Sequence, residues 1–198
     1  MNYKENIKYR ETIEGKAYKS EKMSSEEKWW CISNPMFNPK YDFPCYVRDA
    51  ISVPKDKKIK VTIEVLDFDK TPNVYRPVIG IIGNGEILVD FDLVTYSGKK
   101  AKCRKTKILI PLVDREYRTE TFELFSIDGL VSIAYQCEYY DKFMKLYKRE
   151  ISDGAYLAYG MKKQVLSENR YIYFCKNPKA QNDDFNSFVF MVNFEFND

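Results

Sequence analysis

The sequence predicts an all-β fold: an antiparallel β-sandwich, jelly-roll-like, with one or two short helices. Apolar and polar residues alternate along several segments from residue 59 onward, and Gly, Asn or Asp turn signals separate these segments. The regular alternation of strands and helices that is typical of parallel sheets is missing. Tyr and Phe are numerous, at 16 and 13 residues, and aromatic side chains favour strands. An α+β roll, in which a helix packs across one curved sheet, is the alternative.

The length of 198 residues fits one domain with an extension. We expect residues 1–52 to form an N-terminal arm, a short helix and a Pro-rich loop that pack on the main domain. Ser24 and Glu27 have the spacing of a helix N-cap, and the loop after the helix is predicted from Pro35, Pro39 and Pro44. Residues 53–198 are expected to form the antiparallel β domain.

The predicted strands share short length, alternating or continuous apolar residues, and turn residues at their ends. The pattern is clearest in residues 59–66, where every second side chain is apolar, and in the phenylalanine-rich residues 187–196. Gly83-Asn84-Gly85 predicts a tight turn, because Gly and Asn accept a positive φ at little cost. In chain order the predicted strands are 59–66, 78–82, 87–94, 107–113, 117–125, 131–137, 155–161, 170–175 and 187–196.

Residues 138–151 are the main helix prediction. Their large apolar side chains recur at intervals of three or four residues, and the charged residues fall between them. Asp153-Gly154 would end the helix. The residues that give the helical period are Tyr139, Tyr140, Phe143, Met144, Tyr147 and Ile151.

The chain contains no histidine. Nucleophile activation of the Ser-His-Asp or Cys-His type is therefore excluded within this chain, and so are zinc sites that need imidazole. The five cysteines are odd in number and unclustered, which argues against a disulfide framework or a structural zinc site. We expect no cofactor, and an enzymatic function is not favoured.

Four carboxylates are candidate metal ligands. In Asp67-Phe68-Asp69 and in Asp90-Phe91-Asp92, alternation along a strand places both carboxylates on one face. Two such pairs could bind Mg²⁺ or Ca²⁺ and support a metal-assisted reaction. The simpler interpretation, which we favour, is a turn after the first pair and a solvated strand face for the second.

The segment 98–107 is the most basic part of the chain, although the net charge is only +3. Its cations lie on a predicted hairpin loop, with Tyr96 close by for stacking. Such a loop could bind the phosphates of a nucleic acid or a nucleotide. The alternative is a solvated hairpin whose charges discourage edge-to-edge pairing. The basic residues considered are Lys99, Lys100, Lys102, Arg104 and Lys105.

An aromatic cluster in the Pro-rich stretch is the other candidate binding feature. Trp29 and Trp30 are followed by Phe37, Tyr41 and Phe43. Aromatic platforms in loops bind sugars, bases or protein partners, although such a cluster more often seals one end of a sandwich.

From these features we predict a non-catalytic binding protein that engages a macromolecule, first of all a protein, in the manner of an inhibitor or accessory factor. Nucleic-acid or nucleotide binding through residues 98–107 is the alternative, and a carboxylate-dependent, metal-assisted enzyme is the second alternative. The oligomeric state stays open. The expected contact residues are Trp29, Trp30, Tyr41, Tyr96, Lys99, Lys100, Lys102, Arg104 and Lys105.

The N-terminal residues carry mixed charges and predict no signal peptide. No apolar run is long enough to span a bilayer, so we expect no membrane association. The scattered, unpaired cysteines suit a reducing compartment, and the predicted location is therefore the cytoplasm.

Overall fold

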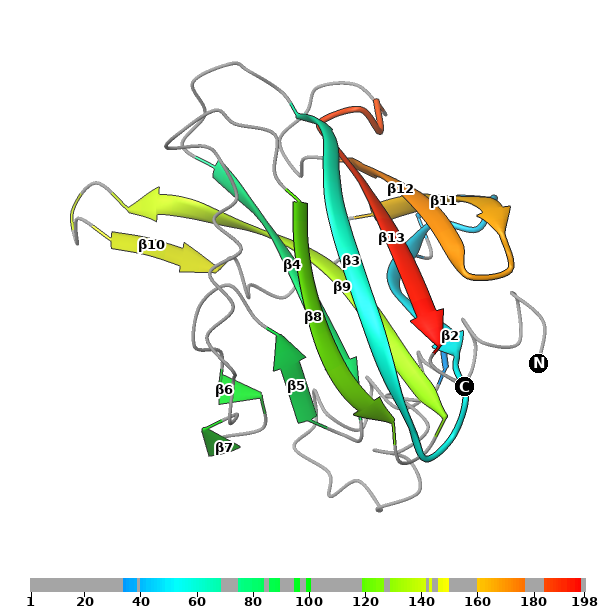
Figure 1. Ribbon diagram of the computed structural model, residues 1–198. Helices are drawn as coiled ribbons and strands as arrows, with labels where there is room; N and C mark the ends of the chain where they lie inside the picture. Colours follow the sequence, from blue (N-terminus) through cyan, green and yellow to red (C-terminus); the bar gives the residue numbers. More distant parts are fainter. Residues whose placement is uncertain are drawn as a thin grey trace, which may run out of the picture.

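The fold is all-β and antiparallel in the computed structural model, which confirms the predicted fold class (Figure 1). Within the described part of the chain every regular element is a strand, and no helix is long and apolar enough to cross a membrane. The described residues are 34–38, 40–68, 75–83, 86–89, 95–96, 99–100, 119–126, 129–141, 143, 146–149, 160–176 and 184–196.

Within these residues, eleven strands form one sheet in the order β5-β4-β9-β2-β11-β12-β13-β3-β8, with β1 paired to β2 and β10 paired to β9. Strands β6 and β7 form a separate two-stranded sheet. The strands are β1 (Met36–Phe37), β2 (Tyr46–Ser52), β3 (Lys57–Phe68), β4 (Tyr75–Gly83), β5 (Glu86–Val89), β6 (Thr95–Tyr96), β7 (Lys99–Lys100), β8 (Thr119–Ser126), β9 (Leu130–Asp141), β10 (Leu146–Arg149), β11 (Gly160–Ser167), β12 (Arg170–Lys176) and β13 (Phe188–Phe196).

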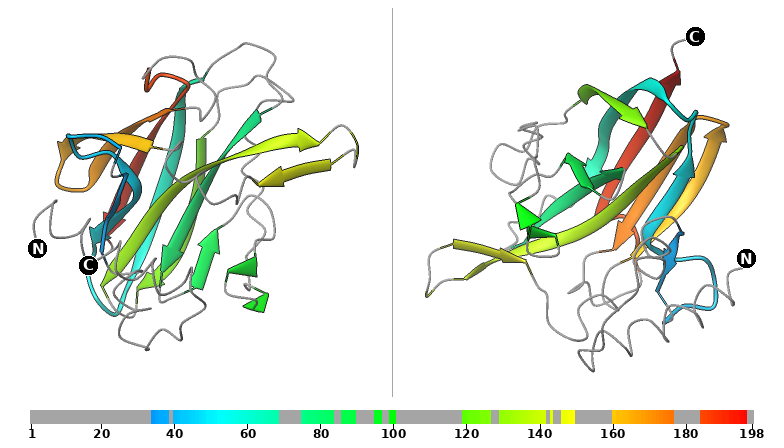
Figure 2. Two further views of the ribbon diagram at one scale, coloured as in Figure 1. Left: turned by 180° about the vertical axis from the view of Figure 1, so that it is seen from behind. Right: turned by 90° about the horizontal axis from the view of Figure 1, so that it is seen from below.

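The large sheet curls so that its two halves face each other. The half made of β3, β8 and β13 lies in front of β4 and β9 in Figure 1, and the view from behind reverses this order (Figure 2). Tyr135 of β9 stacks on Phe188 of β13 with ring centroids 6.1 Å apart, although several strands separate β9 and β13 within the sheet. This contact therefore joins two layers, as in a β-sandwich.

Alternation along the strands builds the core. Ile59, Val61 and Ile63 of β3 are buried on the inner face, and each pairs with a phenylalanine or valine of β13. Every second residue of β13 from Phe188 to Phe194 is buried on the same face. Burying such a side chain contributes about 1.5–3 kcal/mol, so this period-two pattern accounts for much of the stability of the fold. The outer face, which points away from this core, carries the alternate residues.

The predicted helix at 138–151 is wrong. Strand β9 continues to Asp141, turns back, and pairs with β10, so that Tyr140 lies opposite Tyr147. The paired hairpin extends away from the rest of the sheet (Figure 2). Aromatic residues at helical spacing also suit a strand, and β4 offers β9 a partner as far as Tyr139. Hydrogen bonding between strands therefore determines the structure here, although the apolar residues have helical spacing. The other helix predicted, after Ser24, lies outside the described residues.

The Pro-rich stretch is more ordered than predicted. Its end forms β2, which pairs with β9 on one side and with β11 on the other. The division of the chain at residue 52 stays a prediction, and β2 lies within the large sheet. The turn predicted at 83–85 joins β4 to β5, where Gly83 pairs with Glu86. Strand β11 begins at Gly160, near the end of the strand predicted at 155–161.

Strands β2 and β11 separate soon after they meet. Their pairing consists of Met161 opposite Tyr46, whereas β11 pairs with β12 from Gly160 to Ser167. The two halves of the sheet are therefore joined here by a short stretch of backbone pairing. Beyond this point the side chains of β2 and β11 must make the connection.

Candidate functional site

Two clusters of aromatic and charged side chains lie on opposite faces of the β11–β12 hairpin. Lys162 belongs to the outer face and Lys163 to the inner face, because successive residues of a strand point to opposite sides. We call the outer group the aromatic-lysine cluster (Tyr41, Phe43, Phe185, Lys162 and Lys176). The inner group is the Asp49 cluster (Asp49, Lys163, Tyr173, Tyr46 and Tyr171).

A compact loop supplies two rings of the aromatic-lysine cluster. The side chain of Asn38 is buried, and its Oδ1 accepts a hydrogen bond of 3.0 Å from the backbone N–H of Lys40. The backbone N–H of Asn38 donates to the carbonyl of Cys45 at 2.7 Å, which closes the loop between them. Local hydrogen bonds of this kind are typical of Asn at turns. They fix the positions of Tyr41 and Phe43.

The three rings of this cluster pack against one another. Tyr41 lies 5.1 Å from Phe43 and 5.5 Å from Phe185, measured between ring centroids, and Phe43 lies 5.9 Å from Phe185. Tyr41 and Phe185 are buried, whereas Phe43 is half-buried. Tilted and edge-to-face arrangements are the favoured geometries for aromatic pairs. Phe43 is the ring that this cluster presents to solvent.

Strand β11 allows the cluster to sit close to the sheet because it begins with glycine. A Cβ atom at Gly160 would lie 2.2 Å from the Sγ atom of Cys45 and 3.3 Å from Phe185. Cys45 is fully buried under the rings. The loop and Phe185 therefore dock where the strand has no side chain.

Two lysines of the hairpin complete the cluster. Lys162 Nζ lies 4.4 Å from the ring centroid of Phe185 and 4.8 Å from that of Phe43. Lys176 is buried, and its Nζ donates a 3.0 Å hydrogen bond to the hydroxyl oxygen of Tyr41. Lys40 Nζ lies 5.5 Å from the ring of Tyr41. Ammonium groups at these distances are attracted by the ring faces.

The Asp49 cluster lies on the inner side, where β2 and β11 part. Asp49 Oδ2 lies 2.7 Å from Lys163 Nζ and accepts a 2.7 Å hydrogen bond from the hydroxyl of Tyr173. The side chain of Asp49 is only 3% exposed, and that of Lys163 is 16% exposed. This network links β2 to β11 and β12 beyond the short backbone pairing.

Three tyrosines of the Asp49 cluster have perturbed acidity. Burial raises the pKa of Tyr173 well above its usual value, and the negative charge of Asp49 raises it further. Burial, followed by the charge of Asp49, also raises the pKa of Tyr46 and of Tyr171. Lys163 Nζ lies 4.5 Å from the ring centroid of Tyr171 and 5.9 Å from that of Tyr46. The phenols therefore stay protonated at neutral pH, and the hydroxyls of Tyr173 and Tyr171 donate hydrogen bonds to Asp49 and to the carbonyl of Glu168.

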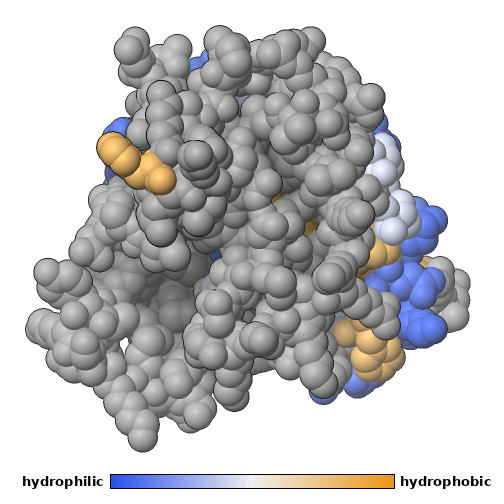
Figure 3. Space-filling view, turned by 90° about the vertical axis from the view of Figure 1, so that its left-hand side faces the viewer, coloured by the Kyte–Doolittle hydropathy of each residue, from blue (hydrophilic) through white to orange (hydrophobic). Residues whose placement is uncertain are grey.

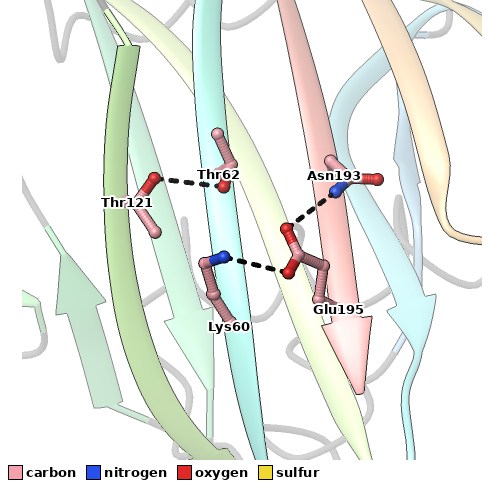
Figure 4. Close-up of polar contacts among 5 residues, drawn as sticks. All are labelled: Lys60, Thr62, Thr121, Asn193 and Glu195. Atoms are coloured by element: carbon pink, nitrogen blue, oxygen red, sulfur yellow. Dashed lines mark hydrogen bonds and ion pairs between the residues drawn. The ribbon is translucent and has the colours of Figure 1, made fainter. Parts of the chain in front are cut away.

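The outer face of β13, β3 and β8 carries a third, exposed polar group. Lys60 Nζ lies 2.9 Å from Glu195 Oε2, and Asn193 Nδ2 donates to Glu195 Oε1 at 3.4 Å (Figure 4). The hydroxyl oxygens of Thr62 and Thr121 lie 3.1 Å apart (Figure 4). Figure 3, which shows the left-hand side of the molecule as drawn in Figure 1, has small hydrophobic spots beside hydrophilic atoms where residues are described. Exposed polar side chains in register across strands are typical of a solvated sheet face.

The structure describes some of the contact residues predicted from the sequence, and the others lie outside the described residues. Tyr41 lies in the aromatic-lysine cluster, but Phe37 packs on Tyr46 instead, with centroids 4.9 Å apart. Tyr96, Lys99 and Lys100 lie in the two-stranded sheet of β6 and β7, where Tyr96 pairs with Lys99 and Thr95 with Lys100. The remaining predicted contacts, Trp29, Trp30, Lys102, Arg104 and Lys105, lie outside the described residues.

The carboxylate hypothesis is addressed at one position. Asp67 is exposed near the end of β3, opposite Val189 of β13. The other three aspartates, Asp69, Asp90 and Asp92, lie outside the described residues. Within the described ranges no group of three or more Cys, Asp or Glu residues is arranged to hold a metal ion.

Sequence reasoning missed Phe185, Lys162 and Lys176 as members of a site. Phe185 is the one aromatic residue in the polar stretch 181–187, which is a signal that could have drawn attention to it. The two lysines carry no local signal, because Tyr41 and Phe43 lie more than 100 residues away along the chain and Phe185 lies outside the β11–β12 hairpin.

Comparison with known proteins gives distant structural likenesses. No family model matches the chain, and a comparison with curated proteins gives no match either. The lectin CV2L of Chromobacterium violaceum, described in complex with alpha-methyl-fucoside, has a TM-score of 0.34 at 12% identity and covers 73% of this chain and 93% of its own. A high-affinity mannose-binding lectin of Ralstonia solanacearum has a TM-score of 0.33 at 13% identity, with coverage of 73% and 93%. The C-terminal domain of the BC2L-C lectin from Burkholderia cenocepacia has a TM-score of 0.31 at 14% identity, with coverage of 73% and 92%.

These comparisons correct the prediction of a macromolecular partner. A protein partner of the inhibitor or accessory-factor type was expected, with nucleic acid as the alternative, but the three structures are lectins. Aromatic and charged loop residues occur in binding sites for sugars, bases and proteins alike, so composition did not separate these classes. At these TM-scores the likeness carries no argument for a particular ligand. The ligand class has to come from the side chains of this chain.

Proposed function

We propose that this protein binds a carbohydrate at the aromatic-lysine cluster without changing it chemically. The half-buried ring of Phe43 beside the exposed side chain of Lys162 is the observation that carries the proposal. A sugar ring presents C–H groups, which pack on aromatic rings, and hydroxyl groups, which need hydrogen-bond donors and acceptors. The aromatic ring supplies the apolar surface and the ammonium group of Lys162 donates hydrogen bonds, whereas acceptors must come from neighbouring side chains.

Polar residues are the chain neighbours of all three aromatic residues. Asp42 lies between Tyr41 and Phe43 in the chain, and Asp184 and Asn186 flank Phe185; all three side chains are exposed. Asp184 Oδ1 also accepts a 2.9 Å hydrogen bond from the backbone N–H of Asn186, which orders the loop before β13. Carboxylates and amides of this kind form hydrogen bonds with neighbouring sugar hydroxyls. Binding sites for small ligands usually consist of apolar and aromatic side chains with a few polar groups.

The cluster is organised before any ligand arrives. The turn at Asn38, the bond from Lys176 to Tyr41 and the close approach of Cys45 to Gly160 hold the loop on the β11–β12 hairpin. Side chains that are already ordered lose little conformational entropy on binding. A site supported in this way can bind a weakly hydrophobic ligand such as a sugar.

The test is titration of the protein with a panel of mono- and oligosaccharides, followed by calorimetry. We expect at least one saccharide to bind, and Phe43→Ala to weaken that binding about fivefold or more, because truncating a residue at the centre of a binding site costs over 1 kcal/mol. Phe125→Ala is the matched control, since it removes an exposed phenyl ring from β8 on another part of the sheet. Absence of saccharide binding, or equal losses in the two variants, would contradict the proposal.

A further inference from the structure

We infer that the carbohydrate bound at the aromatic-lysine cluster carries a negatively charged group, a carboxylate or a sulfate, which Lys162 contacts. This inference rests on the proposed function and specifies its ligand. Three ammonium groups, those of Lys40, Lys162 and Lys176, lie within 5.7 Å of a ring centroid of the cluster. Positive charge thus surrounds the same rings that would hold the sugar.

Lys162 differs from other lysines of the sheet in what its ammonium group contacts. Lys163, the next residue, lies 2.7 Å from the carboxylate of Asp49, and Lys60 lies 2.9 Å from that of Glu195. Among the described residues, the ammonium group of Lys162 lies instead over the rings of Phe43 and Phe185. An anionic ligand would therefore gain the charge of Lys162 without having to break an ion pair of this lysine within the described part of the chain.

A single movement of the Lys162 side chain would contact the anionic group of the ligand and expose the ring of Phe43 to the sugar. Lys162 is exposed, and its ammonium group covers the faces of Phe43 and Phe185. A charge-assisted hydrogen bond to a carboxylate or sulfate oxygen is stronger than a cation–π contact at an exposed site. When Lys162 turns toward such an oxygen, the face of Phe43 becomes accessible to the C–H groups of the sugar.

The other charged groups at the cluster differ in how far water screens them. Lys176 is buried and its ammonium group is held on the hydroxyl of Tyr41, so its positive charge is only partly screened by water. The nearest acidic residues in sequence, Asp42 and Asp184, are exposed and therefore well screened. A negatively charged ligand over the rings would be attracted by the exposed ammonium group of Lys162.

The experiment compares acidic saccharides with neutral counterparts of the same size. The pairs are a galacturonic acid trimer against a galactose trimer, and N-acetylglucosamine 6-sulfate against N-acetylglucosamine. We expect the acidic member of at least one pair to bind roughly tenfold more tightly at low salt, as a charge-assisted hydrogen bond would give. The advantage should shrink at about 0.5 M salt because ions screen the exposed charge. The two pairs distinguish a carboxylate from a sulfate as the recognised group.

Lys162→Met is the decisive variant, since it removes the charge and keeps an unbranched side chain of similar length. We expect it to abolish the advantage of the acidic saccharide and to weaken the acidic member of each pair more than the neutral one, because only the acidic member loses an ion pair with Lys162. Lys162→Arg should retain the advantage, because guanidinium also pairs with carboxylate and sulfate. Lys60→Met, which removes an exposed lysine from β3, should change neither affinity.

The outcomes separate this inference from the proposed function. Equal affinity for acidic and neutral saccharides, or equal losses for both in Lys162→Met, would overturn the charged-ligand inference and leave carbohydrate binding in place. Absence of binding by every saccharide in the panel would overturn the proposed function together with the inference.

Discussion

Two ion pairs of similar length lie in different surroundings, one inside the molecule and one on its outer face. Asp49 and Lys163 are 2.7 Å apart, with a carboxylate that is 3% exposed, whereas Lys60 and Glu195 are 2.9 Å apart and about half exposed. Distance alone would rank the two pairs as nearly equal. Solvent determines the difference, because water screens the outer pair and the inner pair has lost most of its water.

The inner ion pair also connects two strands that share little backbone pairing, whereas the outer ion pair does not. Strands β2 and β11 pair at Tyr46 and Met161, and the Asp49–Lys163 contact continues the connection on the inner side. Lys60 and Glu195 lie on β3 and β13, whose backbones pair along most of their length. The fold therefore depends on the inner side chains where backbone hydrogen bonds are few.

The largest expected effect is that of Asp49→Ala. This substitution leaves the ammonium group of Lys163 and the buried hydroxyl of Tyr173 without their acceptor. Breaking a buried pair in this way destabilises a protein by about 3–5 kcal/mol. Urea unfolding followed by tryptophan fluorescence would measure the loss. A loss below about 1 kcal/mol, the range of exposed pairs, would show that the inner pair is no stronger than the outer one.

Gly160→Ala tests whether every substitution on the outer face has a small effect on stability. The added methyl group would lie 2.2 Å from Cys45 Sγ, and the fully buried thiol has little room to move. Overpacking of this kind costs about 1–3 kcal/mol, more than an exposed ion pair contributes. The same substitution in a Cys45→Ala background should cost less, because the clashing sulfur is gone. Equal costs in the two backgrounds, measured by urea unfolding, would mean that the docked loop does not depend on this contact.

Alkaline pH should weaken the inner cluster more than the outer face. Burial raises the folded-state pKa of Tyr173 well above 10, and the charge of Asp49 adds to this effect. Because the unfolded chain releases the phenol proton near pH 10 and the folded protein keeps it, this contribution is complete below pH 10 and falls as the pH rises. The slope is about 1.4 kcal/mol per pH unit for one group. The unfolding free energy of Tyr173→Phe should therefore decline less between pH 9.5 and 11 than that of the unsubstituted protein, and parallel curves would contradict the assigned role.

The inner and outer faces also differ in how far the sequence predicted them. Alternation placed Ile59, Val61 and Ile63 on one face of a strand, and the structure buries all three. The phenylalanines of β13 followed from the same period. Such patterns are local, because a strand in a sandwich must segregate its side chains whatever its partners are.

The parts that sequence reasoning missed depend on long-range contacts. Strand β2 includes buried charged side chains, Arg48 and Asp49, so its sequence lacks the apolar alternation that marks a strand. Tyr41 was predicted as a binding residue, but its partner Lys176 lies 135 residues further along the chain. The contacts of Asp49 with Lys163 and of Tyr41 with Lys176 become visible only when the sheet order brings β2, β11 and β12 together.

The smallest expected effect is that of Lys60→Ala on the outer face. The side chains of Lys60 and Glu195 are 41% and 48% exposed, so each charged group can be solvated when the other is removed. Exposed pairs contribute about 0.2–1 kcal/mol, and the contribution falls as salt is added. A double-mutant cycle of Lys60→Ala and Glu195→Ala in urea, at low salt and at about 0.5 M salt, isolates this coupling. A coupling energy above about 1 kcal/mol that persists in salt would contradict the contrast with the Asp49–Lys163 pair. It would mean that the order of the outer side chains, and not their exposure to solvent, determines the strength of the pair.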